Sequence, residues 1–185
     1  WFNFGPGVLA SMIGGEGRCG KDTVWFYPGR FEGKELTDMS LELDRESPWF
    51  RRLEEFFRAG AAEWHGRIHL GQTDLGGSLD VVSALRPGEA LLFDLFDCPG
   101  EVKRLNWEVH RVWFEAFDYF NSLLPADNHG FSAWAGLLSQ KSHYMLQCDF
   151  AYMISPDQFA EFVAPELAAS CRRIARPFYH LDGKG

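Results

Sequence analysis

Residues 144–182 constrain the fold most, because extended and helical patterns alternate there over a short distance. An apolar run at 144–150 precedes a well-marked helix start. Ser155 suits the N-cap, Pro156 the first helical position, and Asp157 the positive end of the helix dipole. A second apolar run, residues 177–182, follows the helix. This order predicts two parallel strands joined by a helical crossover, the second of them buried on both faces.

The helix between these runs is predicted to bury one face. Its apolar residues recur at spacings of three and four, namely Phe159, Phe162, Val163, Leu167, Cys171 and Ile174. Pro165 interrupts the pattern and should kink the helix or leave one carbonyl unpaired. Polar, metal-capable side chains follow each extended run. In a parallel α/β protein, that end of the strands carries the chemistry.

Earlier segments continue the alternation of strands and helices. Residues 1–15 should form an extended aromatic stretch, a Gly-Pro-Gly turn and one or two helical turns, and residues 16–22 a polar loop. The expected strands are 23–27, a short edge strand at 41–43, 66–71 and 131–136. The expected helices are 48–64, 79–85 with Ser78 as its cap, 88–96 and 100–123. The order predicts a parallel sheet or barrel.

Two of these helices have clear apolar stripes. The inward side chains expected in 48–64 are Trp49, Leu53, Phe56, Phe57 and Trp64. Those expected in 100–123 are Val102, Leu105, Val109, Val112, Trp113, Phe117 and Phe120. The many aromatic residues outside such stripes fit either a dense core or an apolar, aromatic-lined cavity.

Composition excludes several classes of protein. The net charge is −8 and Lys and Arg are not clustered, which argues against nucleic-acid binding. No stretch approaches the roughly 20 apolar residues of a membrane span. The four cysteines form no CxxC pair, which favours a reducing, cytoplasmic setting. Because the chain starts at Trp1 within an apolar run and stops at Gly185 just after a strand, we expect a piece of a longer protein or a truncated gene product.

Four stretches resemble one known superfamily. They are Gly71-x-Thr-Asp74-Leu-Gly-Gly, Leu91-Leu-Phe-Asp-Leu-Phe-Asp97-Cys-Pro99, Ile154-Ser-Pro-Asp-Gln-Phe-Ala-Glu-Phe-Val-Ala-Pro165-Glu-Leu and Tyr179-His-Leu-Asp-Gly183. Together they are similar to the uroporphyrinogen decarboxylase superfamily, which includes porphyrinogen decarboxylases and corrinoid-linked methyltransferases. The likeness covers most of residues 66–185, and the Ser-Pro helix followed by the His-x-Asp-Gly strand is its most specific part.

The resemblance implies an α/β fold that is the middle portion of a (β/α)8 TIM-type barrel. Residues 1–185 would form a single, truncated barrel domain, with a less regular segment at 1–47 and βα units at 48–185. In the methyltransferase branch the last strand often carries His-x-Cys-Gly, and a later Cys completes a zinc site. Here His180 matches, Asp182 stands in place of the thiolate, and the last ligand would lie beyond Gly185. The Arg-rich signatures of the decarboxylase branch do not occur in this stretch.

His180 and Asp182 are the first candidate metal ligands. They are two residues apart on a predicted strand, so their side chains share a face, and zinc accepts both nitrogen and oxygen ligands. The metal would ionise or polarise a substrate thiol or hydroxyl. The alternative is a hydrogen bond between the two side chains or to a neighbouring strand. Cys148 is a further candidate ligand, with a small apolar core residue as the alternative.

Asp149 and Asp74 are the candidate catalytic residues. Asp149 follows an apolar run and could be a metal ligand, a general acid or base, or a loop cap. Asp74 lies after the strand predicted at 66–71 and should face the mouth of the barrel. The candidate cofactor-binding and pocket-lining residues are Asn3, Trp134, His143 and Tyr144, each with an ordinary loop role as the alternative.

Three functions fit these patterns. The first is an enzyme of metal-assisted methyl transfer that works with a corrinoid protein and zinc. The second is metal-free decarboxylation of a uroporphyrinogen-type tetrapyrrole, with Asp149 or Asp74 holding pyrrole N–H groups. The third is a non-catalytic fragment that completes its barrel by pairing. The expected partners are a small-molecule or tetrapyrrole substrate, a corrinoid protein and a second copy in a homodimer.

Overall fold

The chain folds as a mixed α/β structure. The computed structural model describes residues 2–125 and 127–182, so Trp1, Ala126 and Gly183 of the predicted strand motif, with the two residues after it, lie outside the described part. The described strands form two separate two-stranded sheets, β1 with β2 and β3 with β4. Helices make up most of the remaining regular structure.

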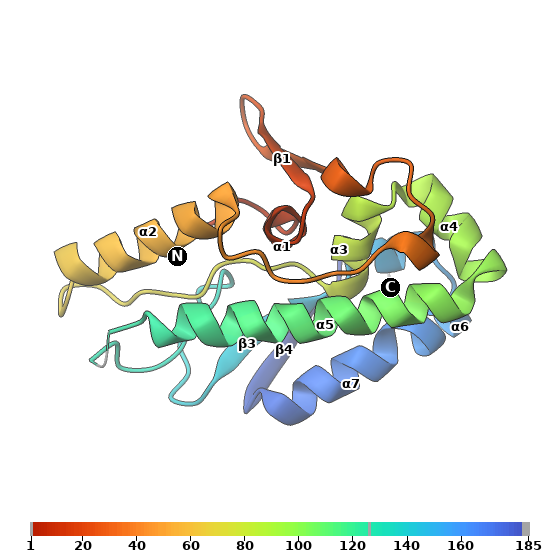
Figure 1. Cartoon of the computed structure of the whole chain (residues 1–185). Helices are drawn as coiled ribbons and strands as arrows, with labels where there is room; N and C mark the ends of the chain where they lie inside the picture. Colours follow the sequence, from red (N-terminus) through yellow and green to blue (C-terminus); the bar gives the residue numbers. More distant parts are fainter. Residues whose placement is uncertain (1, 126, 183–185) are drawn as a thin grey trace.

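The longest helix, α5 (Pro99–Ser122), is the centre of the fold. Figure 1 shows it running the length of the molecule, with α7 and the β3–β4 pair on one side and α1, α2 and the β1 hairpin on the other. Every side chain predicted to point inward is buried, and Asn106, Phe114 and Ala116 join them. The two shorter helices before it, α3 (Ser78–Leu85) and α4 (Gly88–Asp97), also match their predicted bounds. The N-cap of α3, however, is Gly77 and not Ser78.

The predicted parallel crossover is confirmed at the C-terminal end. β3 (His143–Gln147) pairs in parallel with β4 (Arg176–His180), in a register that sets His143 beside Arg176 and Gln147 beside His180. The connection runs through a 3-10 turn, η3 (Asp149–Met153), and the helical segments α6 (Pro156–Gln158), η4 (Phe159–Val163) and α7 (Ala164–Arg173). Ser155 caps α6 as predicted, because its hydroxyl accepts the Gln158 N–H at 3.2 Å.

The crossover helix buries most of the predicted face, since Phe162, Val163 and Ile174 are buried and Phe159 and Leu167 pack against the core. Its segment η4 is a π-turn, which inserts an extra residue ahead of Pro165. The extra residue shifts the buried side within α7, so Glu166 and Ser170 are buried while Cys171 is exposed. Pro165 lies at the start of α7, directly after the π-turn, and the helix continues through it without a break.

The N-terminal region departs most from the prediction. α1 (Val8–Met12) is the expected short helix, and every one of its residues is buried. Residues 16–22 are not simply a loop, since β1 (Glu16–Cys19) pairs antiparallel with β2 (Val24–Tyr27). α2 (Pro48–Glu63) forms as predicted.

The buried side of α2 is rotated from the predicted one. It consists of Phe50, Leu53, Phe57 and Gly60. Phe56 is 38% exposed and stacks on Phe2 and Phe4, with ring centroids 5.4 and 5.8 Å away. Trp64 is likewise 38% exposed. The N-terminal aromatic stretch therefore covers the side of α2 that faces away from the core.

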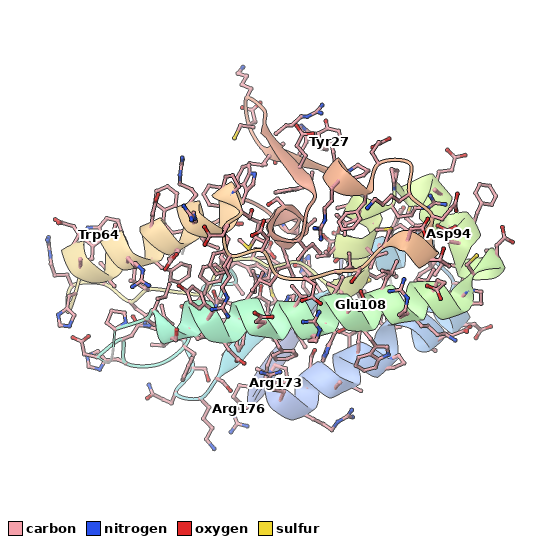
Figure 2. The ribbon with its side chains drawn as sticks, viewed as in Figure 1. Tyr27, Trp64, Asp94, Glu108, Arg173 and Arg176 are labelled. Carbon is pink, nitrogen blue, oxygen red and sulfur yellow. The ribbon has the colours of Figure 1, made fainter. Side chains whose placement is uncertain are left out.

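Contacts with α5 replace the edge strand predicted at 41–43. Glu108 on α5, labelled in Figure 2, accepts the Leu41 N–H at 3.0 Å and pairs with Arg104 at 2.5 Å. Arg104 also donates to the Leu36 carbonyl at 2.8 Å. The irregular segment, which includes the turns η1 (Gly29–Phe31) and η2 (Leu36–Asp38), satisfies its backbone through these side chains and needs no neighbouring strand.

The strands predicted at 66–71 and 131–136 are not formed. Residues 64–68 turn, and the chain is extended only from residue 69. There the amide of Asn128 accepts the Leu70 N–H and donates to the Leu70 carbonyl, both at 2.9 Å, which imitates one rung of a ladder. Residues 131–136 contribute a single bridge, from Phe131 to Ser139. The side chain of Asn128 thus makes the hydrogen bonds to Leu70 that a neighbouring strand would otherwise make.

Candidate functional site

The site lies at the C-terminal end of β3 and β4. Because Gln147 and His180 are register partners in a parallel pair, their side chains leave the same face of the sheet. The opposite face carries Tyr144, Leu146 and Tyr179 and packs against the helices. β4 is therefore not buried on both faces as predicted, and Phe178, on the face of His180, is 50% exposed.

Four titratable residues from three segments converge at this end. The carboxyl group of Asp74 interacts electrostatically with Asp149 and His180. That of Asp149 interacts with Asp182 and His180. The indole of Trp134 meets the His180 ring edge to face, with centroids 5.5 Å apart. The structure therefore brings together five of the predicted site residues.

Asp74 is held in the extended segment before α3. It is 4% exposed, accepts the Gly76 N–H at 2.9 Å and receives the amide of Gln147 at 3.4 Å. Burial raises its pKa to about 6, and the neighbouring carboxylates of Asp149 and Asp80 add to the rise. Gly76 makes this geometry possible, because its φ is +71° and a Cβ there would lie 2.1 Å from the Pro6 carbonyl oxygen.

Asp149 begins the turn after β3 and is half-buried. Its Oδ1 is buried without a hydrogen-bond partner among residues 2–125 and 127–182. Desolvation raises the pKa of Asp149, as do the charges of Asp80 and Asp182, while His180 lowers it. Both candidate carboxyl groups thus hold protons more tightly than an exposed carboxyl group would.

Two of the predicted site residues have structural positions instead. Tyr144 is fully buried, and its hydroxyl donates to the Thr73 carbonyl at 3.0 Å and accepts the Leu75 N–H at 2.7 Å. Its ring packs on Trp113, 4.8 Å away, so it belongs to the core. Cys148 is 2% exposed and lies on the helix-covered face. Burial raises the pKa of its thiol far above the usual value, which opposes the thiolate form that a metal needs.

The other two pocket candidates also lie apart from the site. Asn3 is exposed, its side chain accepts the Gly5 N–H at 2.7 Å, and it borders a surface hollow next to the β1–β2 hairpin. His143 is buried at the opposite end of β3, where its Nδ1 lies 2.6 Å from the Arg176 carbonyl. Both contacts are local to those segments.

The zinc prediction is met only in part. An imidazole and carboxylates are suitable zinc ligands, and His180 lies near the carboxyl groups of Asp149 and Asp74. In the part of the chain that the structure describes, however, no group of three or more His, Cys, Asp and Glu side chains is placed to hold a metal ion. The described residues do not complete the set, so no reaction step is assigned to zinc.

Three further residues shape the site and were not predicted. Gln147 reaches Asp74, Asp80 anchors the turn that carries Asp149, and Glu166 is buried beneath the start of α3. Strand alternation could have identified Gln147, since it is two residues from Met145 on the face opposite Tyr144. The position of Asp80, three residues after Gly77, has the spacing of a capping acid. The burial of Glu166 follows from the π-turn, which the sequence does not signal.

None of the described helices is long and apolar enough to cross a bilayer. No protein-family model, curated protein or solved structure matches the chain. The superfamily resemblance therefore stays a prediction, and the candidate site rests on the geometry of its own residues.

Proposed function

We propose that this chain carries the proton-transfer centre of an enzyme related to the uroporphyrinogen decarboxylase superfamily, built on part of a (β/α)8 barrel. One observation carries the proposal: Asp74, Asp149 and His180 come from distant segments and lie within electrostatic range of one another at the C-terminal end of two parallel strands. That is where α/β enzymes place their reacting groups.

The proposed roles follow from burial and charge. Asp74, with a pKa of about 6, exchanges protons near neutral pH and is the proposed general acid or base. The buried Oδ1 of Asp149 has no partner among residues 2–125 and 127–182, and it is the proposed acceptor of a substrate N–H, O–H or S–H. Trp134 and His180 form one wall, against which a flat or apolar substrate group can pack.

For methyl transfer, a corrinoid protein would supply the methyl group. The part assigned to this chain is to take the proton of an acceptor thiol or hydroxyl, which makes that atom nucleophilic. Asp74 is the proposed proton acceptor there, with Asp149 and His180 beside it.

Decarboxylation is the second candidate, and the pair of neighbouring carboxyl groups favours it. Loss of CO2 leaves a carbon that must gain a proton, and a carboxyl group with a pKa of about 6 can deliver one. Asp149 can meanwhile accept a pyrrole N–H. Methyl transfer and decarboxylation would use the same residues and differ in the substrate that binds to them.

The test uses the whole chain and two assays: transfer of methyl from methylcobalamin to 2-mercaptoethanol, and conversion of uroporphyrinogen to less carboxylated products. Asp74→Asn, Asp149→Asn and His180→Ala should each lower the active reaction by about 100-fold or more. Asp97→Asn, an exposed carboxyl group on α4, is the matched control and should stay within about twofold.

Two outcomes would count against this proposal. Full activity in the Asp74→Asn and Asp149→Asn proteins would remove the acid–base roles. Zinc content that is unchanged in His180→Ala would remove that side chain from any metal site. Absence of both reactions, in a protein that elutes only as a larger assembly, would favour the non-catalytic alternative.

A further inference from the structure

We infer that Asp80 is a positioning residue that fixes Asp149 in the candidate site by holding its backbone. The inference rests on the proposed function, because the role of Asp80 is defined by what Asp149 does. Asp80 is the third residue of α3, and its carboxyl group is directed at the turn that follows β3.

The carboxyl group of Asp80 joins two separate segments. Its Oδ2 accepts the N–H of Gly77 and the N–H of Asp149, each at 3.1 Å, and its Oδ1 accepts the N–H of Phe150 at 2.8 Å. Two consecutive residues of the turn after β3 therefore bind to one side chain.

A helix cap alone does not explain this arrangement. Capping needs only the bond to Gly77, which lies within the first turn of α3. The bonds to Asp149 and Phe150 reach across 69 and 70 residues of sequence. Without Asp80, the N–H groups of these two residues would lose their partners, which destabilises the turn wherever they stay buried.

The geometry also gives Asp80 and Asp149 different roles. Both oxygens of Asp80 are occupied by backbone donors, whereas Asp149 keeps one oxygen without a partner among the described residues. Fixing the N–H of Asp149 fixes its Cα and the direction in which its side chain leaves the turn. Asp80 thus orients the carboxyl group that faces the substrate and does not itself reach it.

The experiment compares Asp80→Asn, Asp80→Glu, Asp149→Asn and the double variant Asp80→Asn/Asp149→Asn in the whole chain. Asp80→Asn should lower kcat by about 10- to 100-fold with KM within about twofold, because a misplaced group slows the chemical step. Asp80→Glu should recover part of the loss. The double variant should be no slower than Asp149→Asn, since Asp80 acts through Asp149. Asp157→Asn, an exposed acid in the first turn of α6, is the control and should match the parent protein.

Amide hydrogen exchange tests the same inference without an assay of activity. In the unaltered chain, the N–H groups of Asp149 and Phe150 should be protected at least about 100-fold relative to exposed turn amides. Asp80→Asn should remove that protection and leave β3 protected. This measurement decides the inference even where neither reaction is found, so failure of the proposed function and failure of the inference are distinguishable.

Either of two results would overturn the inference. One is rapid exchange of both amides in the unaltered chain, which also settles the question if Asp80→Asn does not fold. The other is a double variant whose loss is the product of the two single losses, because that would make Asp80 independent of Asp149.

Discussion

The two faces of the β3–β4 pair differ in what covers them. On one face, the ring of Tyr144 packs on Trp113 of α5, and the ring centroids of Tyr179 and Phe159 of η4 are 6.3 Å apart. On the other face, the His180 ring meets that of Trp134 and lies within electrostatic range of the carboxyl groups of Asp74 and Asp149, and Phe178 is half exposed. On β4, therefore, one set of alternating residues packs on the helices and the other lies next to the candidate site, whereas every residue of β3 is buried.

This separation predicts that substitutions on the two faces have different consequences. Changes on the helix-covered face should lower the free energy of unfolding. Changes to the β4 residues of the opposite face, which carries Phe178 and His180 and is called the open face here, should lower activity and leave the free energy of unfolding nearly unchanged.

The largest effect is expected for Tyr144→Ala on the helix-covered face. The side chain is fully buried against Trp113 and Phe117, so its loss should cost about 3–5 kcal/mol of unfolding free energy. Urea denaturation measures this cost. Tyr144→Phe isolates the hydroxyl, which bonds to Thr73 and Leu75, and should cost about 1–2 kcal/mol. Equal stability of Tyr144→Ala and the parent protein would contradict the assignment of this residue to the core.

His180→Ala is the corresponding change on the open face. Activity should fall about 100-fold, equivalent to about 2.7 kcal/mol of transition-state stabilisation, while the urea midpoint stays close to that of the parent. Activity and denaturation measured on one preparation test both halves. A large fall in stability would mean that the two faces are not separated as described.

Glu166 should make stability depend on pH. Burial raises the pKa of this residue from 4.5 to about 8, the nearby charge of Asp80 adds to the rise, and a hydrogen bond with Ser78 opposes it. The folded state therefore binds the proton more tightly than the unfolded state. The stabilisation is complete below pH 4.5 and is lost as the pH rises through about 8.

Glu166→Gln, which cannot ionise, tests this linkage. Relative to the parent, the variant should gain stability on the order of 2 kcal/mol between pH 6 and pH 8. Unfolding curves at several pH values provide the measurement. Parallel pH profiles for the two proteins would show that Glu166 is not buried as described.

The smallest effect is expected for Phe178→Ser. Half of this side chain is already in contact with solvent, so its replacement should change the unfolding free energy by less than about 1 kcal/mol. Leu146→Ala, on the buried face of the adjacent strand, is the matched comparison and should cost about 2–4 kcal/mol. Similar costs at the two positions would remove the distinction between the faces.

The sequence predicted the elements whose signals are local. The apolar periodicity of α5 and the cap of Ser155 identified the central helix and the parallel crossover, because propensity and packing agree there. The strand predicted at 23–27 is formed as β2, but its partner β1 was not predicted, since β1 is mostly exposed and carries no alternating apolar pattern. A strand was predicted at 66–71, but the side chain of Asn128, from a distant turn, bonds to the backbone there instead.

The sequence predicted which residues belong to the candidate site better than it predicted how they are arranged. His180, Asp149 and Asp74 were named because polar residues follow extended runs, and these three do meet. Cys148 and Tyr144 lie on the helix-covered face, because each is an odd number of residues from Gln147 along the chain. Asp80 depends on contacts between residues that are far apart in sequence, which no local pattern encodes.

The π-turn at Phe159–Val163 has a consequence for chain length in the crossover. Deleting one residue from this turn would return the following helix to ordinary winding. Leu167 and Cys171 would rotate inward, and Glu166 would rotate towards water, where its carboxyl group ionises normally. One surplus residue thus decides whether the protein keeps an acid in its interior.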